Sequence, residues 1–398
     1  MANRQTIRLS ERRPKHLRRS ELSEELAVRL SRKYPSAVTV EFPTPLNGER
    51  WTITSQGWIG YLPVSPECMV EITPRIQIDN LFRMLEYAYR LKSFQIFPGV
   101  IHVRSIEAFF DRLARVLADL AMARRRRGLY REYVPAHDEL PYVRGRMDFV
   151  RRVEQPWRAL LDCEFEEHTA NIADNQIIAY CLKWIAKSGR CSQATAPHVR
   201  RAYRMYAAEI DVPRFDLKAC IGRFYNRLNQ DYEPIHGLCR FFLEHAGPRL
   251  DSGDHTMPPF AVNMDHLFEM FVAEWLAAHL PASLRLKAQE SVQLDRNNTL
   301  RFSIDLVIYD REKNTPLAVL DTKYKRPKAP DTADVAQAVA YAESKNVKLA
   351  ALIYPEPLPR SSKIIVGQTR VETLEFDLTK NLEESSPVFL HQILTLMS

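Results

Sequence analysis

Hydrophobic and polar residues alternate along residues 37–73. This spacing of two predicts short β-strands with one buried face. Residues 21–34 instead carry leucine at every fourth position, which predicts a helix. We therefore expect a small β-rich domain at residues 1–75. Its strands are expected at residues 37–42, 51–55, 57–64 and 69–72.

Apolar residues recur at helical spacing from residue 80 onward. The segment 130–160 is mixed and includes a strand or a turn at residues 140–149. A polar stretch rich in Gly and Pro at residues 247–259 indicates a domain boundary. We therefore expect a mostly helical middle domain at residues 76–255. Its helices are expected at residues 81–89, 106–124, 171–187 and within 195–247.

Residues 256–398 combine helical and strand patterns. Asn263 is a favourable N-cap for a helix whose apolar stripe runs from Met264 to Leu276. Two strongly apolar strands, a second helix and a third strand follow. The order helix, hairpin, helix, strand predicts an α/β core. These later elements are expected at residues 301–309, 317–324, 331–345 and 347–354.

The predicted hairpin carries charged residues in strands that are otherwise apolar. If its turn is centred on Lys313, Asp305 lies directly opposite Asp321, and Lys323 returns to the face of Asp321. Charges in buried strands are costly unless they pair or bind a metal. Facing carboxylates suit Mg²⁺, which can activate a water for phosphodiester attack, while a lysine stabilises the developing charge. The alternative is an exposed hairpin whose polar face carries charge by chance.

The overall charge favours a polyanionic partner only weakly. The chain has 56 Lys and Arg against 49 Asp and Glu, a formal charge of +7. The four arginines from Arg124 to Arg127 suit the negative end of a helix dipole, the interpretation that we favour, or a phosphate.

The cysteine spacing and the motifs that the sequence lacks predict an intracellular protein that binds no nucleotide itself. The six cysteines form no C-x-x-C pair, which indicates free thiols in a reducing compartment. His236, Cys239 and His245 are a zinc alternative that we disfavour, because structural zinc needs four ligands. The sequence has no secretory signal, membrane span or P-loop, so we expect a cytoplasmic protein that binds no membrane and no nucleotide.

The polar residues of the C-terminal segment occur in a recognisable order: Leu267-Phe268-Glu269, Asp305, Asp321-Thr322-Lys323 and Gln337-x-x-x-Tyr341. This order resembles the PD-(D/E)xK nuclease superfamily, and Q-x-x-x-Y is typical of its RecB-like branch. Ile304 stands where the superfamily's name has proline. The resemblance implies Mg²⁺, or Mn²⁺ in its place, held by Asp305, Asp321 and Glu269, with Glu274 as the alternative helix glutamate. The residues implied to be catalytic are Asp305, Asp321, Lys323, Gln337 and Tyr341.

A wider set of motifs lies before this segment: Pro74-Arg75-Ile76, residues 80–88, Arg144-Gly145-Arg146 and the acidic stretch before Asn171. Together they resemble the McrC family, the nuclease subunit of McrBC-type modified-cytosine restriction systems. The resemblance implies a partner, an McrB-like AAA+ GTPase hexamer that also recognises DNA. It also implies that the N-terminal part of the chain contacts this ring and stimulates its GTPase.

These inferences predict a Mg²⁺-dependent DNA endonuclease subunit of a GTP-dependent restriction complex, with a multidomain α+β fold. We expect residues 1–75 to contact the motor and residues 256–398 to form the PD-(D/E)xK nuclease core. Two alternatives are a stand-alone DNA repair or recombination nuclease and a non-catalytic adaptor that activates an AAA+ motor. The long segment before residue 250 argues against the first, and the intact Asp305, Asp321 and Lys323 argue against the second.

Overall fold

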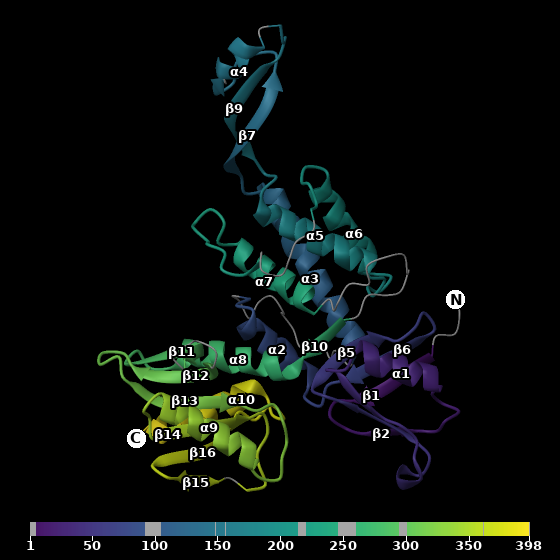
Figure 1. The fold of residues 1–398 in the computed structure, drawn as a ribbon, viewed down its shortest axis with the longest axis vertical. Helices are drawn as coiled ribbons and strands as arrows, with labels where there is room; N and C mark the ends of the chain where they lie inside the picture. Colours follow the sequence, from purple (N-terminus) through teal and green to yellow (C-terminus); the bar gives the residue numbers. More distant parts are fainter. Residues whose placement is uncertain are drawn as a thin grey trace. The chain divides into compact units, whose positions relative to one another are not determined.

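The computed structural model shows a mixed α+β chain that divides into two compact units (Figure 1). One unit contains Met1–Phe109 and His245–Ser398, and the other contains Phe110–Glu244. The described residues are 5–91, 105–147, 149–155, 157–213, 220–245, 260–293, 301–360 and 362–397. The predicted boundary at residue 255 lies outside these ranges.

Two small sheets form the N-terminal part of the first unit. Their inward side chains and helix α1 (Glu24–Lys33) share one core, which includes Leu30, Ile53 and Val70. The helix predicted at residues 21–34 is therefore confirmed. The four-stranded sheet has the order β1 (Gln5–Ser10), β6 (Cys68–Thr73), β5 (Trp58–Pro63) and β10 (Phe260–Asn263). The three-stranded sheet has the order β2 (Lys15–Leu17), β4 (Trp51–Ser55) and β3 (Val38–Glu41).

Strand β10 joins the N-terminal sheet, although the sequence placed it with the C-terminal domain. Phe260 pairs with Tyr61 and Ala261 with Gly60. Gly60 has a φ of +124°, and a Cβ there would lie 2.1 Å from the Phe260 carbonyl oxygen, so this close pairing requires glycine. A three-domain division with a boundary at residue 75 is therefore a poor description, because the β-rich segment and the C-terminal core form one unit.

Helix α2 also belongs to the first unit and not to the middle region. It spans Ile78–Ala88 and packs against α8 (Met264–His279). Tyr87 meets Phe271 edge-on, with ring centroids 5.8 Å apart. Asn263 caps α8 by accepting hydrogen bonds from the backbone N–H groups of Asp265 and His266, as its sequence position predicted.

A six-stranded mixed sheet forms the C-terminal core. Helix α9 (Thr332–Ser344) packs on β14 through Ala338, Ala342 and Leu352. Helices α8 and α10 (Leu382–Met397) meet around Phe376, which contacts Trp275 and Phe389. The strand order is β11 (Leu284–Gln293), β12 (Arg301–Asp310), β13 (Pro316–Thr322), β14 (Leu349–Tyr354), β16 (Thr369–Glu375) and β15 (Lys363–Val366).

The second unit combines helices with a sheet that the sequence did not predict as such. The helices are α3 (Ile106–Arg127), α5 (Ala173–Lys187), α6 (Ala196–Ala207) and α7 (Tyr232–Glu244). The sheet has the order β7 (Glu132–Leu140), β9 (Leu161–Thr169) and β8 (Arg146–Met147), with the short helix α4 (Phe149–Glu154). A mostly helical middle domain is thus an incomplete description, since β7 and β9 are largely exposed and show little alternation.

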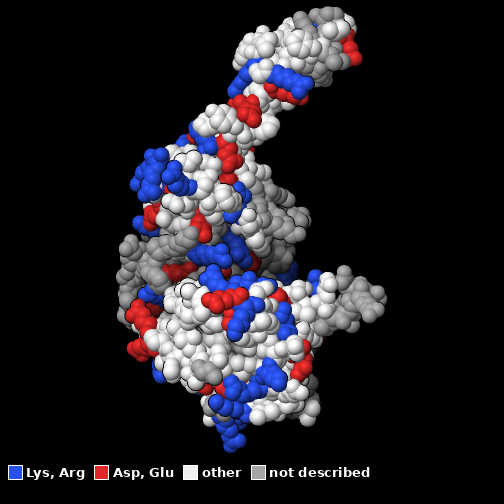
Figure 2. Space-filling model, turned by 90° about the vertical axis from the view of Figure 1, so that its left-hand side faces the viewer, with Lys and Arg blue, Asp and Glu red and all other residues white. Residues whose placement is uncertain are grey.

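Two arginines of the run at the end of α3 form ion pairs within the protein. Arg124 makes two hydrogen bonds to Asp231, and Arg125 lies 2.7 Å from Glu209. These side-chain contacts do not test whether the run interacts with the helix dipole or with a phosphate. On the face drawn in Figure 2, patches of both signs are interspersed with uncharged surface.

Candidate active site

Two aspartates meet where strands β12 and β13 separate. The antiparallel pairs Leu306–Leu320 and Val307–Val319 make Asp305 and Asp321 the next residues along the two strands. This is the register that a turn centred on Lys313 predicts. Asp321 is 1% exposed. Two carboxylates therefore lie at one end of a buried strand pair, where they need compensating groups.

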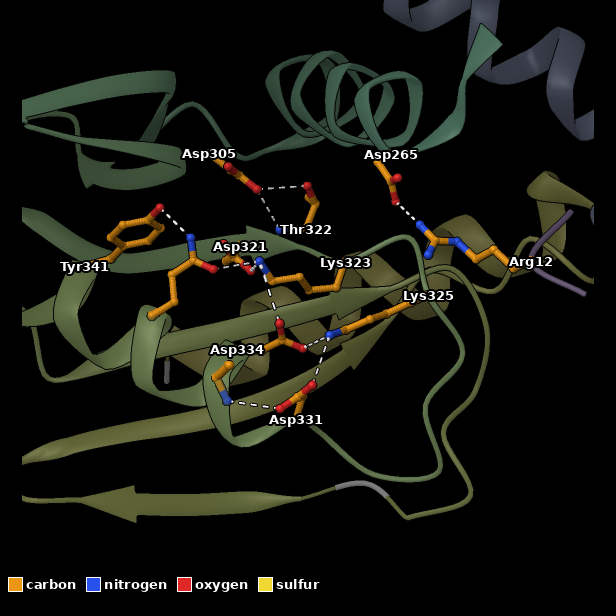
Figure 3. A network of polar contacts seen from close by, with 12 residues as sticks. Arg12, Asp265, Asp305, Asp321, Thr322, Lys323, Lys325, Asp331, Asp334 and Tyr341 are labelled. Atoms are coloured by element: carbon orange, nitrogen blue, oxygen red, sulfur yellow. Dashed lines mark hydrogen bonds and ion pairs between the residues drawn. The ribbon is translucent and has the colours of Figure 1, made fainter. Parts of the chain in front are cut away.

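Asp305 is held in place by Thr322, the residue between Asp321 and Lys323. Its Oδ2 accepts hydrogen bonds from the Thr322 backbone N–H at 2.9 Å and from the Thr322 hydroxyl at 3.0 Å (Figure 3). Thr322 is a site residue that was not predicted from the sequence. Its only signal was its position inside Asp321-Thr322-Lys323, next to the end of the strand.

Lys323 lies between β13 and helix α9. Its Nζ is 2.8 Å from Asp321 Oδ2 and donates a hydrogen bond of 2.9 Å to Gln337 Oε1. Gln337 Nε2 in turn donates to the Tyr341 hydroxyl at 2.7 Å. The amide of Gln337 therefore orients the lysine, and Tyr341 orients the amide. These hydrogen bonds bring together all three residues predicted from the motif. Figure 3 shows Lys323 and Tyr341 at the two ends of this chain of contacts.

Further charges extend this network beyond the predicted residues. Asp334 Oδ1 is 4.0 Å from Lys323 Nζ, and Asp334 Oδ2 is 2.5 Å from Lys325 Nζ. Lys325 also lies 3.8 Å from Asp331, the N-cap of α9. Asp334 was missed, but it is three residues before Gln337 and so shares that face of the helix. The same helical spacing that grouped Gln337 with Tyr341 would have found it.

Burial and mutual repulsion perturb the two aspartates. Burial, reinforced by the charge of Asp305, raises the pKa of Asp321 to about 7 even though Lys323 lowers it. Burial and the charge of Glu269 raise the pKa of Asp305, against the hydrogen bonds from Thr322. Burial lowers the pKa of Lys323, but the surrounding aspartates raise it more, so the lysine stays charged.

The two helix glutamates have different surroundings. Glu269 lies 3.9 Å from His266 and is close enough to Asp305 to affect its pKa. Glu274 instead forms a bidentate ion pair with Arg90, with both N–O distances 2.9 Å. The ion pair of Glu274 with Arg90 therefore joins α8 to the end of α2. Glu269 is the glutamate whose charge raises the pKa of Asp305.

The donor set fits a hard divalent cation in part. Asp305 and Asp321 supply carboxylate oxygens, and Asp321 Oδ2 is buried without a well-oriented hydrogen bond. A cation would compensate the buried carboxylate charges, whose burial and mutual repulsion raise the pKa values of both aspartates. Throughout the described ranges, however, no three His, Cys, Asp or Glu side chains are grouped as metal ligands. Glu269 is therefore not in a preformed three-ligand arrangement with the aspartates.

The zinc alternative is not supported. His236 contacts the Tyr225 hydroxyl at 3.0 Å and the Asp174 carbonyl oxygen at 2.9 Å. Burial lowers its pKa to about 4, so it is a neutral core histidine. His245 contacts the Tyr89 hydroxyl at 3.0 Å.

In the part of the chain that the structure describes, no helix is long and apolar enough to cross a bilayer.

Comparisons with known proteins place these features in a family. The model of the family described as "McrBC 5-methylcytosine restriction system component" matches residues 53–355. A curated relative from Escherichia coli (strain K12), "Type IV methyl-directed restriction enzyme EcoKMcrBC", is 21% identical over 273 residues, which is 63% of this chain and 74% of that protein.

The fold is also similar to that of a solved structure. A chain of the Thermococcus gammatolerans assembly of McrB AAA+ hexamers with bound McrC aligns with a TM-score of 0.61 and 17% identity. The alignment covers 98% of this chain and 100% of the other. Because the family model spans more than half of the sequence, the chain belongs to the McrBC 5-methylcytosine restriction system component family, as its resemblance to McrC predicted.

Proposed function

We propose that this chain is the Mg²⁺-dependent DNA endonuclease subunit of a McrBC-like, GTP-dependent restriction complex, built on a PD-(D/E)xK core. The observation that carries the proposal is the convergence of Asp305, Asp321 and Lys323 at one end of the β12–β13 pair. Buried carboxylates with raised pKa values next to a charged lysine are expected at a catalytic site more often than at a structural one.

The residues of this chain divide the chemistry between them. Asp305 and Asp321 would hold Mg²⁺, with Glu269 as a further ligand, and Mn²⁺ would be an alternative ion. The bound ion would supply an activated water and offset charge on the phosphate oxygens. Lys323 places a fixed positive charge where negative charge develops, and its hydrogen bond to Gln337 holds the ammonium in place.

The same proposal includes an AAA+ GTPase partner. The relative of known structure assembles with McrB hexamers, and this chain has no P-loop sequence of its own. The contact surface that we favour is the β7–β9 hairpin with α4, because large apolar side chains are exposed there. Trp157 is 78% exposed and Tyr142 is 58% exposed. Others on this segment are Tyr133, Val143, Phe149 and Val153.

Exposed apolar patches of this kind mark protein interaction sites. The hairpin is also built for a defined shape, because a Cβ at Gly145 would lie 2.3 Å from the Glu164 carbonyl oxygen and the residue has a φ of +69°. We therefore place the motor contact on this hairpin in preference to residues 1–75, which form one unit with the nuclease core.

The two alternatives make different predictions. A stand-alone nuclease would cut DNA without a GTPase partner, and an adaptor would stimulate the partner without cutting. The test is plasmid cleavage with and without the AAA+ partner, GTP and Mg²⁺, on methylated and unmethylated DNA. Cleavage that needs all three supports the proposal. Stimulated GTP hydrolysis without cleavage in every condition would support the adaptor instead.

A further inference from the structure

A cavity of about 610 Å³ opens in the first unit where the turn after β1 meets the residues that follow β13. Five cationic side chains line it: Arg12, Arg13, Arg75, Lys325 and Arg326. Three acidic side chains, Glu11, Asp331 and Glu356, also line it, so the formal balance is positive. We call this the arginine cavity.

The turn after β1 is fixed firmly to the nuclease core. Glu11 is 1% exposed, and its Oε2 accepts hydrogen bonds of 3.3 Å from the Tyr324 hydroxyl and the Arg75 backbone N–H. The Arg75 guanidinium lies over the Tyr324 ring, 4.5 Å from its centroid. Since Tyr324 directly follows Lys323, these contacts connect the N-terminal sheet to the segment after β13 that carries the proposed catalytic lysine.

Arg12 provides a second attachment. It has a φ of +52°, which is uncommon for a residue other than glycine, and its guanidinium lies 2.6 Å from Asp265 at the start of α8. Figure 3 shows this pair beside the network of Lys323 and Lys325. The backbone conformation of Arg12 and its ion pair with Asp265 together fix the position of this side chain at the edge of the cavity.

The cavity is linked to the proposed active site through Lys325, which lines the cavity. Lys325 is two residues after Lys323, and Asp334 contacts both lysines. On the other side of the cavity, Arg326 lies 3.0 Å and Arg75 lies 3.6 Å from Glu356. Arg13 is exposed, and the described residues include no ion-pair partner for its side chain. A row of cations therefore leads away from Lys323 to an arginine that faces solvent.

We propose that the arginine cavity binds backbone phosphates of the DNA strand next to the phosphate that is cut, so that the N-terminal sheet forms part of the substrate site. This inference rests on the proposed nuclease function. Arginine forks match phosphate oxygens, and phosphate contacts fix the register of a nucleic acid without reading its sequence. DNA is the polyanion that must lie beside Lys323 whenever the enzyme acts, which favours it over an acidic protein segment.

The test measures DNA binding separately from cleavage. The full chain carrying Asp321→Asn is titrated with a short fluorescein-labelled duplex by anisotropy over a series of salt concentrations. Arg13→Ala with Arg326→Ala is introduced in this background. The matched control is Arg29→Ala with Arg32→Ala, which removes the same charge from the exposed face of α1 in the same unit.

Loss of two phosphate contacts lowers the slope of log K against log salt concentration by about 2 and weakens binding about tenfold or more at moderate salt. The control is expected to keep the parent slope. Arg13→Ala alone, at an exposed side chain, is expected to lower the slope by about 1 without changing the melting temperature.

Two results would overturn the inference. One is an unchanged salt slope in both the single and the double variant. The other is unchanged DNA binding with loss of GTPase stimulation, which would make the cavity a protein contact. Failure of the proposed nuclease function would be seen differently, as wild-type protein that binds DNA with the expected slope but does not cut it with partner, GTP and Mg²⁺ present.

Discussion

Replacing Asp321 with Asn is the sharpest perturbation of the proposed site. The amide keeps the size of the carboxyl group and resembles its protonated form, but it is a poor ligand for a hard cation. Asp321 is almost completely buried, so its charge is compensated mainly by Lys323 at 2.8 Å. The substitution is therefore expected to abolish cleavage, by at least about a thousandfold, while the fold is preserved.

Although Asp321→Asn is expected to abolish cleavage, it is expected to stabilise the folded protein when no metal is bound. The pKa of Asp321 is about 7 in the folded protein, whereas its ordinary value is 3.8. The folded state therefore keeps this proton to higher pH than the unfolded state does. Stability from this group is fully present below pH 4 and is lost as the pH rises to about 7. The difference between the folded and unfolded pKa values of Asp321 corresponds to about 4 kcal/mol in the free energy of unfolding at neutral pH.

The assay compares the melting temperatures of the wild type and Asp321→Asn from pH 4 to 8, with and without Mg²⁺. Without metal, the variant is expected to be more stable at pH 8, and the two proteins to converge toward pH 4. Glu11 and Glu86 also have pKa values raised to about 7 by burial, so the comparison with the variant isolates Asp321. Mg²⁺ should stabilise only the wild type. Full cleavage by the variant would refute the assignment of the active site.

Three further predictions follow from the same network. Lys323→Ala should lose cleavage but keep the stabilisation by Mg²⁺, because Asp305 and Asp321 remain; loss of both would make the lysine a structural residue. Glu269→Gln should lower the cleavage rate by about tenfold to a hundredfold, the range for groups that support a metal site, whereas wild-type cleavage would assign Glu269 to the surface. Tyr142→Ala with Trp157→Ala should reduce stimulation of the partner's GTPase without changing Mg²⁺ binding. The control Ile365→Ala, at an exposed apolar residue on β15, should leave GTPase stimulation unchanged. Equal effects of the variant and the control would argue against the hairpin contact.

The geometry of the aspartates was predictable because it depends on local sequence. Two apolar strands joined by a short turn predict which residues face each other, and the observed pair Leu306–Leu320 has the predicted register. The strands reach this register through a shift between Ile308 and Tyr309, which the hydrophobic pattern did not indicate. The face shared by Gln337 and Tyr341 follows equally from helical periodicity. The hydrogen bond that Lys323 donates to Gln337 could not be read from the sequence, because it depends on how α9 packs against β13.

Strands whose partners are distant were missed for a physical reason. The Tyr324 hydroxyl donates to Glu11 across 313 positions of sequence, and β1 pairs with β6 in parallel. No local periodicity records such contacts. Strand β11 was missed because its residues are mostly polar or half-buried and Gln289 has a φ of +52°, which interrupts its pairing with β12. A protein ending near residue 250 would lack β10, so it is unsuitable for testing the N-terminal part alone.

The charges around the proposed site form two neighbouring regions of opposite sign. Asp305, Asp321 and Asp334 exceed the charge of Lys323 and Lys325. Burial first, and neighbouring carboxylates second, raise the pKa values of Asp305 and Asp321, so the charged forms of these two aspartates are unfavourable without a further cation. The arginine cavity beside them is formally positive. A divalent cation would compensate the first region and DNA phosphates the second, so neither ligand alone balances the site. Binding of both together is therefore favoured by charge compensation, and the two should be separable experimentally by varying Mg²⁺ at fixed ionic strength and ionic strength at fixed Mg²⁺.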